Sequence, residues 1–112
     1  MKNQVQLIGK LGKDPIVRTF GNDKKVANFS VATSDYYYDA DGNKQTDTQW
    51  HNVVVWNKLA TICEDKLAKG KEVIVTGKLT YRNYDDKDGN KKYVTEIVAN
   101  EVLLMDTKKQ SA

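Results

Sequence analysis

Hydrophobic and polar residues alternate along most of the chain, and turn residues interrupt the alternation roughly every dozen positions. Alternation with a period of two predicts half-buried β-strands, so we expect an all-β domain of several antiparallel strands. The expected strands span about residues 4–11, 16–20, 26–34, 46–56, 72–84 and 92–104. The pairs Asp41-Gly42 and Asp88-Gly89 predict tight turns between the strands on either side of them.

One segment departs from the alternation and predicts a short helix. Between Asn57 and Leu67 the apolar residues follow helical spacing, at Leu59, Ile62, Cys63 and Leu67. Asn57 is the expected N-cap of this helix, and Gly70 lies beyond its C-terminal end. The helical pattern also makes Cys63 a small buried hydrophobe and not a reactive thiol.

The order of elements predicts a fold. Three strands precede the helix and two follow it, with residues 16–20 continuing the first strand after a bend at Gly12 and Pro15. This is the order of an OB-fold, a five-stranded Greek-key barrel with one short helix between strands 3 and 4. We expect the OB-fold over residues 1–106 and a short flexible C-terminal tail over residues 107–112. Such barrels bind oligonucleotides or oligosaccharides, although a fold alone does not define a function.

Two tryptophans on one strand indicate an unusual surface. Within residues 46–56, alternation places Trp50 and Trp56 on one face and His51, Val53 and Val55 on the other. Large apolar groups therefore occupy both faces of this strand. Two interpretations stay open from this strand alone: a binding face, or a second packed layer covered by the helix or by a subunit.

The strand over residues 72–84 favours the binding face. Lys78, Arg82 and Tyr84 share one side of it, opposite Val73, Val75, Leu79 and Tyr81. Adjacent strands would align this basic side with the tryptophans. Aromatic rings that stack on bases and cations that follow phosphates are the two groups a single nucleic-acid strand requires.

Three consecutive tyrosines, Tyr36, Tyr37 and Tyr38, lie where the strand over residues 26–34 enters a loop. Alternation sends Tyr37 to the face opposite its two neighbours, so at least one ring is expected to be exposed. Packing of the rings across a hairpin is the alternative interpretation.

Composition and motifs exclude several classes of function. The 112 residues fit one domain, and the net charge of +3 permits a polyanionic partner without requiring one. The sequence contains neither a signal peptide nor an apolar run that could span a membrane, so a cytoplasmic, nucleoid-associated protein is expected. His51 has no cysteine or second histidine to complete a metal site, and no catalytic or nucleotide motif occurs. We therefore expect no enzyme activity, no metal and no cofactor.

Several segments resemble the bacterial single-stranded DNA-binding protein family. They are LIGKLGKDPIVR (7–18), VANFSVAT (26–33), WHNVVVW (50–56) with KLA (58–60), KG (69–70) and VTGKL (75–79). They occur in the family's order and spacing, and the resemblance extends to about Met105. It implies an OB-fold homotetramer, with a dimer as the alternative, that binds single-stranded DNA without sequence preference. The implied role is protection of that DNA during replication, recombination and repair.

The resemblance also implies roles for individual residues. The family's stacking aromatics fall on Tyr37, Trp50, Trp56 and Tyr84, where the family often has tryptophan at the first and last positions and phenylalanine at the third. Its basic phosphate contacts fall on Arg18, Lys58, Lys69, Lys78 and Arg82. His51 corresponds to a histidine at the family's subunit contact. Asn52 replaces a residue that is often basic, which predicts weaker binding or a shallower salt dependence.

The C-terminal residues also depart from the family pattern. Family members typically continue into a long tail with an acidic end, which recruits replication and repair enzymes, whereas this sequence stops at Thr107-Lys-Lys-Gln-Ser-Ala112. Either the sequence is truncated or it is a short form, and recruitment through the tail is not carried over to it.

Two other functions remain as alternatives. An adaptor derived from the same family would bind a protein partner tightly and DNA weakly, but such an adaptor has no need of four stacking aromatics. An oligosaccharide-binding OB-fold would also use aromatic platforms. Lys78 and Arg82 count against it, because a sugar surface needs no basic face.

Overall fold

The computed structural model describes residues 2–105, so the tail expected over residues 107–112 lies outside the described part of the chain. The elements follow in the order β1 (Val5–Leu11), β2 (Ile16–Phe20), β3 (Lys24–Tyr38), β4 (Lys44–Trp56), α1 (Asn57–Lys66), β5 (Glu72–Asp85) and β6 (Lys91–Leu104). All six expected strands and the expected helix are therefore confirmed. Among the described residues, no helix has the length and apolar character needed to cross a membrane.

The strands close into a barrel, as the element order predicts. They lie in the order β1-β5-β6-β4-β3-β2, and β1 also pairs with β3 through Lys10 with Ala32 and Leu11 with Val31. This last pairing joins β1, β3, β4, β5 and β6 into a closed ring. The short strand β2 pairs with β3 beyond the bend at Gly12 and Pro15. The OB-fold and its helix between β4 and β5 are confirmed.

The core lies inside the barrel and beneath α1. Alternate residues of each strand point inward, and the helix adds Ala60 and Cys63, followed by Leu67. Each valine or larger side chain removed from water contributes roughly 1.5–3 kcal/mol, so this core supplies most of the stabilising free energy. The Cys63 side chain is 1% exposed, and burial raises the pKa of its thiol to about 11, which keeps it protonated at neutral pH.

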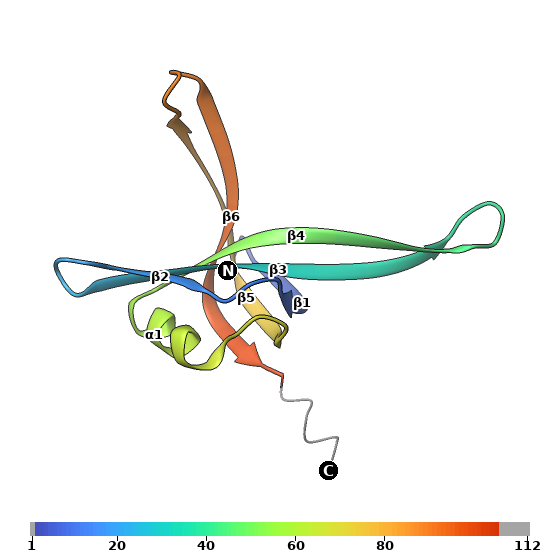
Figure 1. Cartoon of the computed structure of the whole chain (residues 1–112), viewed down its shortest axis with the longest axis horizontal. Helices are drawn as coiled ribbons and strands as arrows, with labels where there is room; N and C mark the ends of the chain where they lie inside the picture. Colours follow the sequence, from blue (N-terminus) through green and yellow to red (C-terminus); the bar gives the residue numbers. More distant parts are fainter. Residues whose placement is uncertain (1, 106–112) are drawn as a thin grey trace, which may run out of the picture.

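Two long hairpins, β3–β4 and β5–β6, extend from the barrel as arms in different directions (Figure 1). The sequence predicted a strand that ends at residue 34, but β3 continues to Tyr38 because Tyr36, Tyr37 and Tyr38 pair with residues 44–46 of β4. The two hairpin tips share the sequence pattern Asp-x-Asp-Gly-Asn, at residues 39–43 and 86–90. Gly42 and Gly89 have φ angles of +83° and +81°, which other residues seldom adopt.

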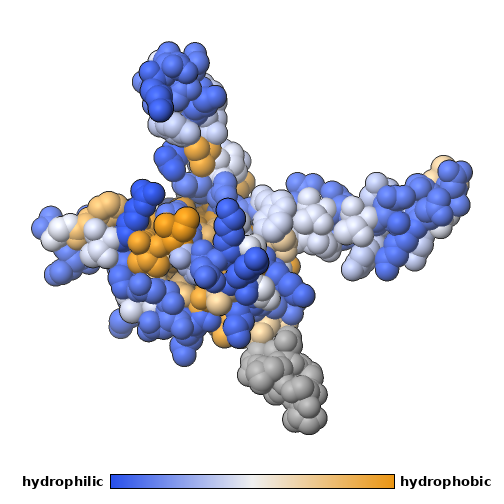
Figure 2. Space-filling view, in the orientation of Figure 1, coloured by the Kyte–Doolittle hydropathy of each residue, from blue (hydrophilic) through white to orange (hydrophobic). Residues whose placement is uncertain are grey.

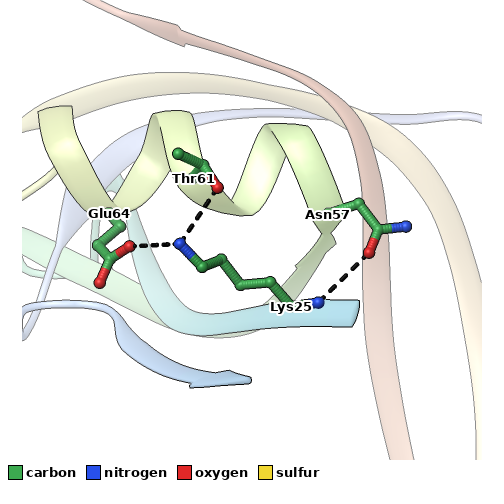
Figure 3. Close-up of polar contacts among 4 residues, drawn as sticks. All are labelled: Lys25, Asn57, Thr61 and Glu64. Atoms are coloured by element: carbon green, nitrogen blue, oxygen red, sulfur yellow. Dashed lines mark hydrogen bonds and ion pairs between the residues drawn. The ribbon is translucent and has the colours of Figure 1, made fainter. Parts of the chain in front are cut away.

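Tyr81 lies on the side of β5 that carries Val73 and Val75, and it is 73% exposed because its part of β5 lies in the arm, beyond the barrel. One expectation about an individual residue is wrong. Asn57 was expected to cap α1, but Trp56 occupies the N-cap and no side chain caps the helix there. Asn57 has a φ of +54°, and its Oδ1 accepts a hydrogen bond of 3.3 Å from the backbone N–H of Lys25 (Figure 3). Asparagine tolerates this left-handed conformation, which turns the chain from β4 into α1.

Candidate nucleic-acid interface

The strand registers assemble one continuous surface on the outside of the barrel. Residues paired across neighbouring strands point to the same side of a sheet. Arg18 on β2 is paired with Val26 on β3, which is paired with Trp56 on β4. A second row crosses all five strands of this surface, from β2 to β5, through Ile16, Asn28, Val54, Val98 and Lys78. We call the surface that these rows define the outer face.

Trp50 and Trp56 both lie on the outer face, as their paired residues Ala32 and Val26 do. They are 61% and 44% exposed, so within the described chain the helix does not cover them, while cover by a second subunit stays the alternative interpretation. They are six positions apart on β4, which corresponds to about 20 Å along an extended strand. Two stacking surfaces this far apart would contact separate bases of one strand.

Two valines near the tryptophans, Val26 on β3 and Val54 on β4, form part of the outer face. Val26 and Val54 are buried, yet neither belongs to the cluster that fills the barrel. Both lie on the outer side of their strands, so they give the outer face an apolar floor. In Figure 2 the hydrophobic residues gather over the central body, while hydrophilic residues dominate the surface of the two arms.

Gly12 supports the Trp50 ring, a role that the sequence did not predict. A Cβ atom at Gly12 would lie 2.5 Å from Cζ3 of Trp50, closer than atoms can approach without moving. Together with Lys13 and Ser30, these two residues line a hollow of about 270 Å³ beside the indole. The bend after β1 therefore brings the backbone against the edge of the ring.

The predicted cations are distributed around this face. Lys78 and Arg18 lie on its rows, and both are exposed. Lys58 is exposed in the first turn of α1, two residues after Trp56. Lys69 is exposed in the loop before β5, and its backbone N–H donates a 2.8 Å hydrogen bond to Oδ1 of Asp14 in the loop after β1. Arg18 and Lys78 therefore lie on the outer face itself, whereas Lys58 and Lys69 lie on α1 and in the loop before β5.

Arg82, the fifth predicted cation, is already paired. Its Nε and one terminal nitrogen donate to Oε1 and Oε2 of Glu96, each at 3.1 Å. This ion pair raises the pKa of the Arg82 guanidinium, chiefly through the hydrogen bonds to Glu96. No sequence pattern indicated this pair, because the two residues lie on different strands and meet only through the register of β5 and β6.

Two hollows of about 170 and 140 Å³ flank Asn52 on the outer face. Glu96 lines both hollows, and Trp50 lines the second. Asn52 lies alongside Glu96 because Val54 and Val98, two residues further along, are paired between the parallel strands β4 and β6. Within residues 2–105 no group of three or more His, Cys, Asp or Glu side chains is arranged to hold a metal.

The predicted tyrosines lie on the arms, away from the tryptophans. Tyr84 is 48% exposed on β5, on the same side of the strand as Lys78 and Arg82. Tyr37 is 54% exposed on β3, but alternation places it on the side of that arm opposite Trp50. Tyr36 lies on the side of Trp50, with Lys44 Nζ 4.0 Å from the centre of its ring.

His51 points to the opposite side of β4 from the tryptophans. It is half-buried, and its Nε2 lies 2.9 Å from Oγ1 of Thr33 in a hydrogen bond. This environment holds the imidazole in place and offers no partner for general acid–base chemistry. Contact of His51 with a second chain remains a prediction.

These features define the chain as an OB-fold domain with exposed aromatic and basic side chains on the outside of its barrel. The profile of the single-strand binding protein family matches residues 2–105, and the chain belongs to this family.

Three comparisons place it more closely. It is 46% identical over 107 residues to "Single-stranded DNA-binding protein 1" of Chlorobaculum tepidum, covering 95% of this chain and 66% of that protein. It is 44% identical to "Single-stranded DNA-binding protein 1" of Xylella fastidiosa, covering 97% of this chain and 81% of that protein. A solved structure described as "Plasmodium falciparum SSB complex with ssDNA" is similar with a TM-score of 0.85 and 30% identity, over 95% of this chain and 97% of the other. The chain thus spans just under two thirds of the length of the first relative.

Proposed function

We propose that this protein binds single-stranded DNA without sequence preference and protects it during replication, recombination and repair. The observation that carries this proposal is the exposure of Trp50 and Trp56 on one basic face of the barrel. Membership of the single-strand binding protein family supports it, as does the similarity to a structure described as a complex with single-stranded DNA.

In the proposed mechanism, stacking supplies the contact that tolerates any sequence. Bases stack on Trp50 and Trp56 at the centre of the outer face, and on Tyr84 and Tyr37 along the two arms. Each stacked base contributes about 1–3 kcal/mol, and every base has a π-face, so no base edge needs to be recognised. The strand would follow the outer face from the barrel onto the β5–β6 arm, and it would have to pass around the β3–β4 arm to reach Tyr37, which lies on the side opposite Trp50.

Phosphate contacts supply the remaining attraction. Arg18, Lys58, Lys69 and Lys78 are exposed around the tryptophans and are positioned to neutralise phosphates. Because Asn52 carries no charge, the centre of the face depends on stacking, and the cations act from its edges. In a plot of log affinity against log salt concentration, each phosphate neutralised should therefore contribute about −0.7 to the slope.

We also propose that several copies assemble, as a homotetramer with a dimer as the alternative. A row of apolar side chains crosses the outside of β1, β5 and β6 through the paired residues Ile8, Ile74 and Leu103. Ile8 and Leu103 are 54% and 50% exposed. A second copy packed on this row would remove its apolar surface from water. His51 is the further candidate for a subunit contact.

Removal of the tryptophan rings tests the proposed function. Trp50→Ala and Trp56→Ala should each weaken binding of oligo-dT by about 1–3 kcal/mol, because each removes one stacking surface. Fluorescence anisotropy of a labelled oligo-dT measures this without relying on the tryptophan signal. The circular dichroism spectra of both variants should show that the fold is retained, since both rings are exposed.

Tyr81→Ala is the matched control, because Tyr81 is exposed on β5 but lies on the side of the strand opposite Tyr84. It should bind oligo-dT as the wild type does. A wild-type protein that fails to bind oligo-dT at low salt, or tryptophan variants that bind it unchanged, would rule the proposed function out.

A further inference from the structure

One acidic side chain lies in the middle of the outer face, where a phosphate-binding surface would be expected to avoid negative charge. Glu96 on β6 points to the same side as Lys78 on β5 and Val54 on β4. It lines the hollows beside Asn52, one of which Trp50 also lines. A strand stacked on Trp50 would therefore pass close to this carboxylate.

The exposure of the Glu96–Arg82 pair is asymmetric. The side chain of Glu96 is 13% exposed, whereas that of Arg82 is 57% exposed. The guanidinium thus covers the carboxylate and is held by two hydrogen bonds of 3.1 Å, which use both carboxylate oxygens. Within residues 2–105 the structure gives Glu96 no other cationic partner, and its neighbour Asn52 is uncharged.

A phosphate could recruit Arg82 fully only by drawing it away from Glu96. That exchange would leave a carboxylate with little exposure to water and without a cation, which is costly. The planar, two-bond geometry with Glu96 is also as favourable for a guanidinium as the geometry that a phosphate offers. The pair should therefore persist when DNA binds.

We propose that Glu96 holds Arg82 in a neutral pair on the outer face and thereby removes one cation from the charge available to phosphates. Glu96 is then a positioning residue that limits the affinity for single strands and makes its salt dependence shallower. This inference rests on the proposed single-strand binding. The family resemblance suggested five basic residues as phosphate contacts. According to this inference, Arg82 does not neutralise a phosphate, whereas the other four remain candidates.

The salt dependence of binding to a short oligo-dT tests the inference. In E96Q the guanidinium keeps its charge and loses its counter-charge, so one more phosphate can be neutralised. The plot of log affinity against log salt should steepen by about 0.7, and the ratio of variant to wild-type affinity should rise about fivefold for a tenfold dilution of salt. An equal or shallower slope overturns the proposal.

The double variant R82Q/E96Q gives an independent answer, and it decides the matter if E96Q fails to fold. It removes both charges and leaves the local net charge unchanged, so its slope should equal that of the wild type. A slope shallower by about 0.7 would show that Arg82 already neutralises a phosphate, and would overturn the proposal. K78Q, which removes an unpaired cation of the same face, should give that shallower slope and so shows that the assay resolves one charge.

E64Q is the matched control for removing an acid from an ion pair. Glu64 Oε1 lies 2.8 Å from Lys25 Nζ, which also donates to Thr61, and this cluster joins β3 to α1 (Figure 3). Lys25 alternates to the side of β3 opposite Val26, which lies on the outer face. The salt slope of E64Q should match that of the wild type, and a slope as steep as that of E96Q would overturn the proposal. Wild-type protein that does not bind oligo-dT at all would instead remove the proposed function, so the two failures are distinguishable.

Discussion

At the scale of single residues, the sequence predicted the candidate binding side chains better than it predicted the residues that contact and position them. Alternation alone placed Trp50 and Trp56 on one face, and both rings are exposed within the described chain. Gly12 and Glu96 were missed, because each acts through a neighbour distant along the chain. Gly12 contacts Trp50 across the bend after β1, and Glu96 meets Arg82 through the pairing of β5 with β6. Contacts of this kind leave no local sequence pattern.

Gly12→Ala should displace the Trp50 ring without unfolding the domain. The added Cβ would lie 2.5 Å from Cζ3 and 2.8 Å from Cη2 of the indole, and the exposed ring can rotate away. Affinity for oligo-dT should fall by no more than the about 1–3 kcal/mol of one stacked base. Anisotropy titration measures the loss, and circular dichroism checks the fold.

Gly21→Ala is the control for this substitution, since a Cβ at Gly21 meets no atom within 4 Å. It should leave affinity unchanged. If Gly12→Ala binds oligo-dT as tightly as Gly21→Ala, the backbone at Gly12 does not position the ring for stacking.

At the scale of elements, the period-two pattern predicted every strand, but it underestimated the length of the β3–β4 arm. Inside the barrel the alternation is clear because one side of each strand is buried. In the arm both sides are exposed, so residues 35–38 show no apolar alternation although they pair fully with β4. The Asp-Gly turn signals located both hairpin tips correctly, since a left-handed residue is required there whatever the strand length.

The tip of the β3–β4 arm should become less stable in acid, because hydrogen bonds to the Asp39 carboxylate stabilise it. Its Oδ1 accepts hydrogen bonds of 2.9 Å from the backbone N–H groups of Asn43 and Asp41, and its Oδ2 accepts from Gln45. The bond from Asn43, with help from the others, lowers the pKa of the Asp39 carboxyl below its ordinary value of 3.8. The folded tip therefore favours the ionised carboxylate of Asp39. The resulting stabilisation is complete above pH 3.8, and it is lost as the pH falls through the lower pKa that Asp39 has in the folded protein.

The amide chemical shifts of Asp41 and Asn43, followed by NMR against pH, report this loss. Their common midpoint should lie below 3.8, and Asp39→Asn should abolish the transition. Asp41→Asn removes a charge from the same tip and should keep the transition. A midpoint at or above 3.8 would contradict the hydrogen-bonded role of Asp39.

At the scale of the whole molecule, the order of elements was enough to predict a closed barrel, because few topologies connect three strands, a helix and two strands without crossing. The surface available to a second copy was not predicted. Ile8, Ile74 and Leu103 come from three segments, and each alternates normally with inward residues of its own strand. Only the register of β1, β5 and β6 shows that they form one apolar row.

Ile8→Glu should therefore disrupt assembly and leave the barrel folded. Ile8 lies on the outside of β1, so the new carboxylate is hydrated in a free chain but would lose its water when a second copy covers the row, which is costly without a partner charge. Sedimentation velocity should give a smaller species for the variant than for the wild type. Asn22→Glu adds the same charge in the exposed turn between β2 and β3 and should sediment as the wild type does. An Ile8→Glu protein with wild-type sedimentation would place the subunit contact elsewhere, with the side of β4 that carries His51 as the next surface to test.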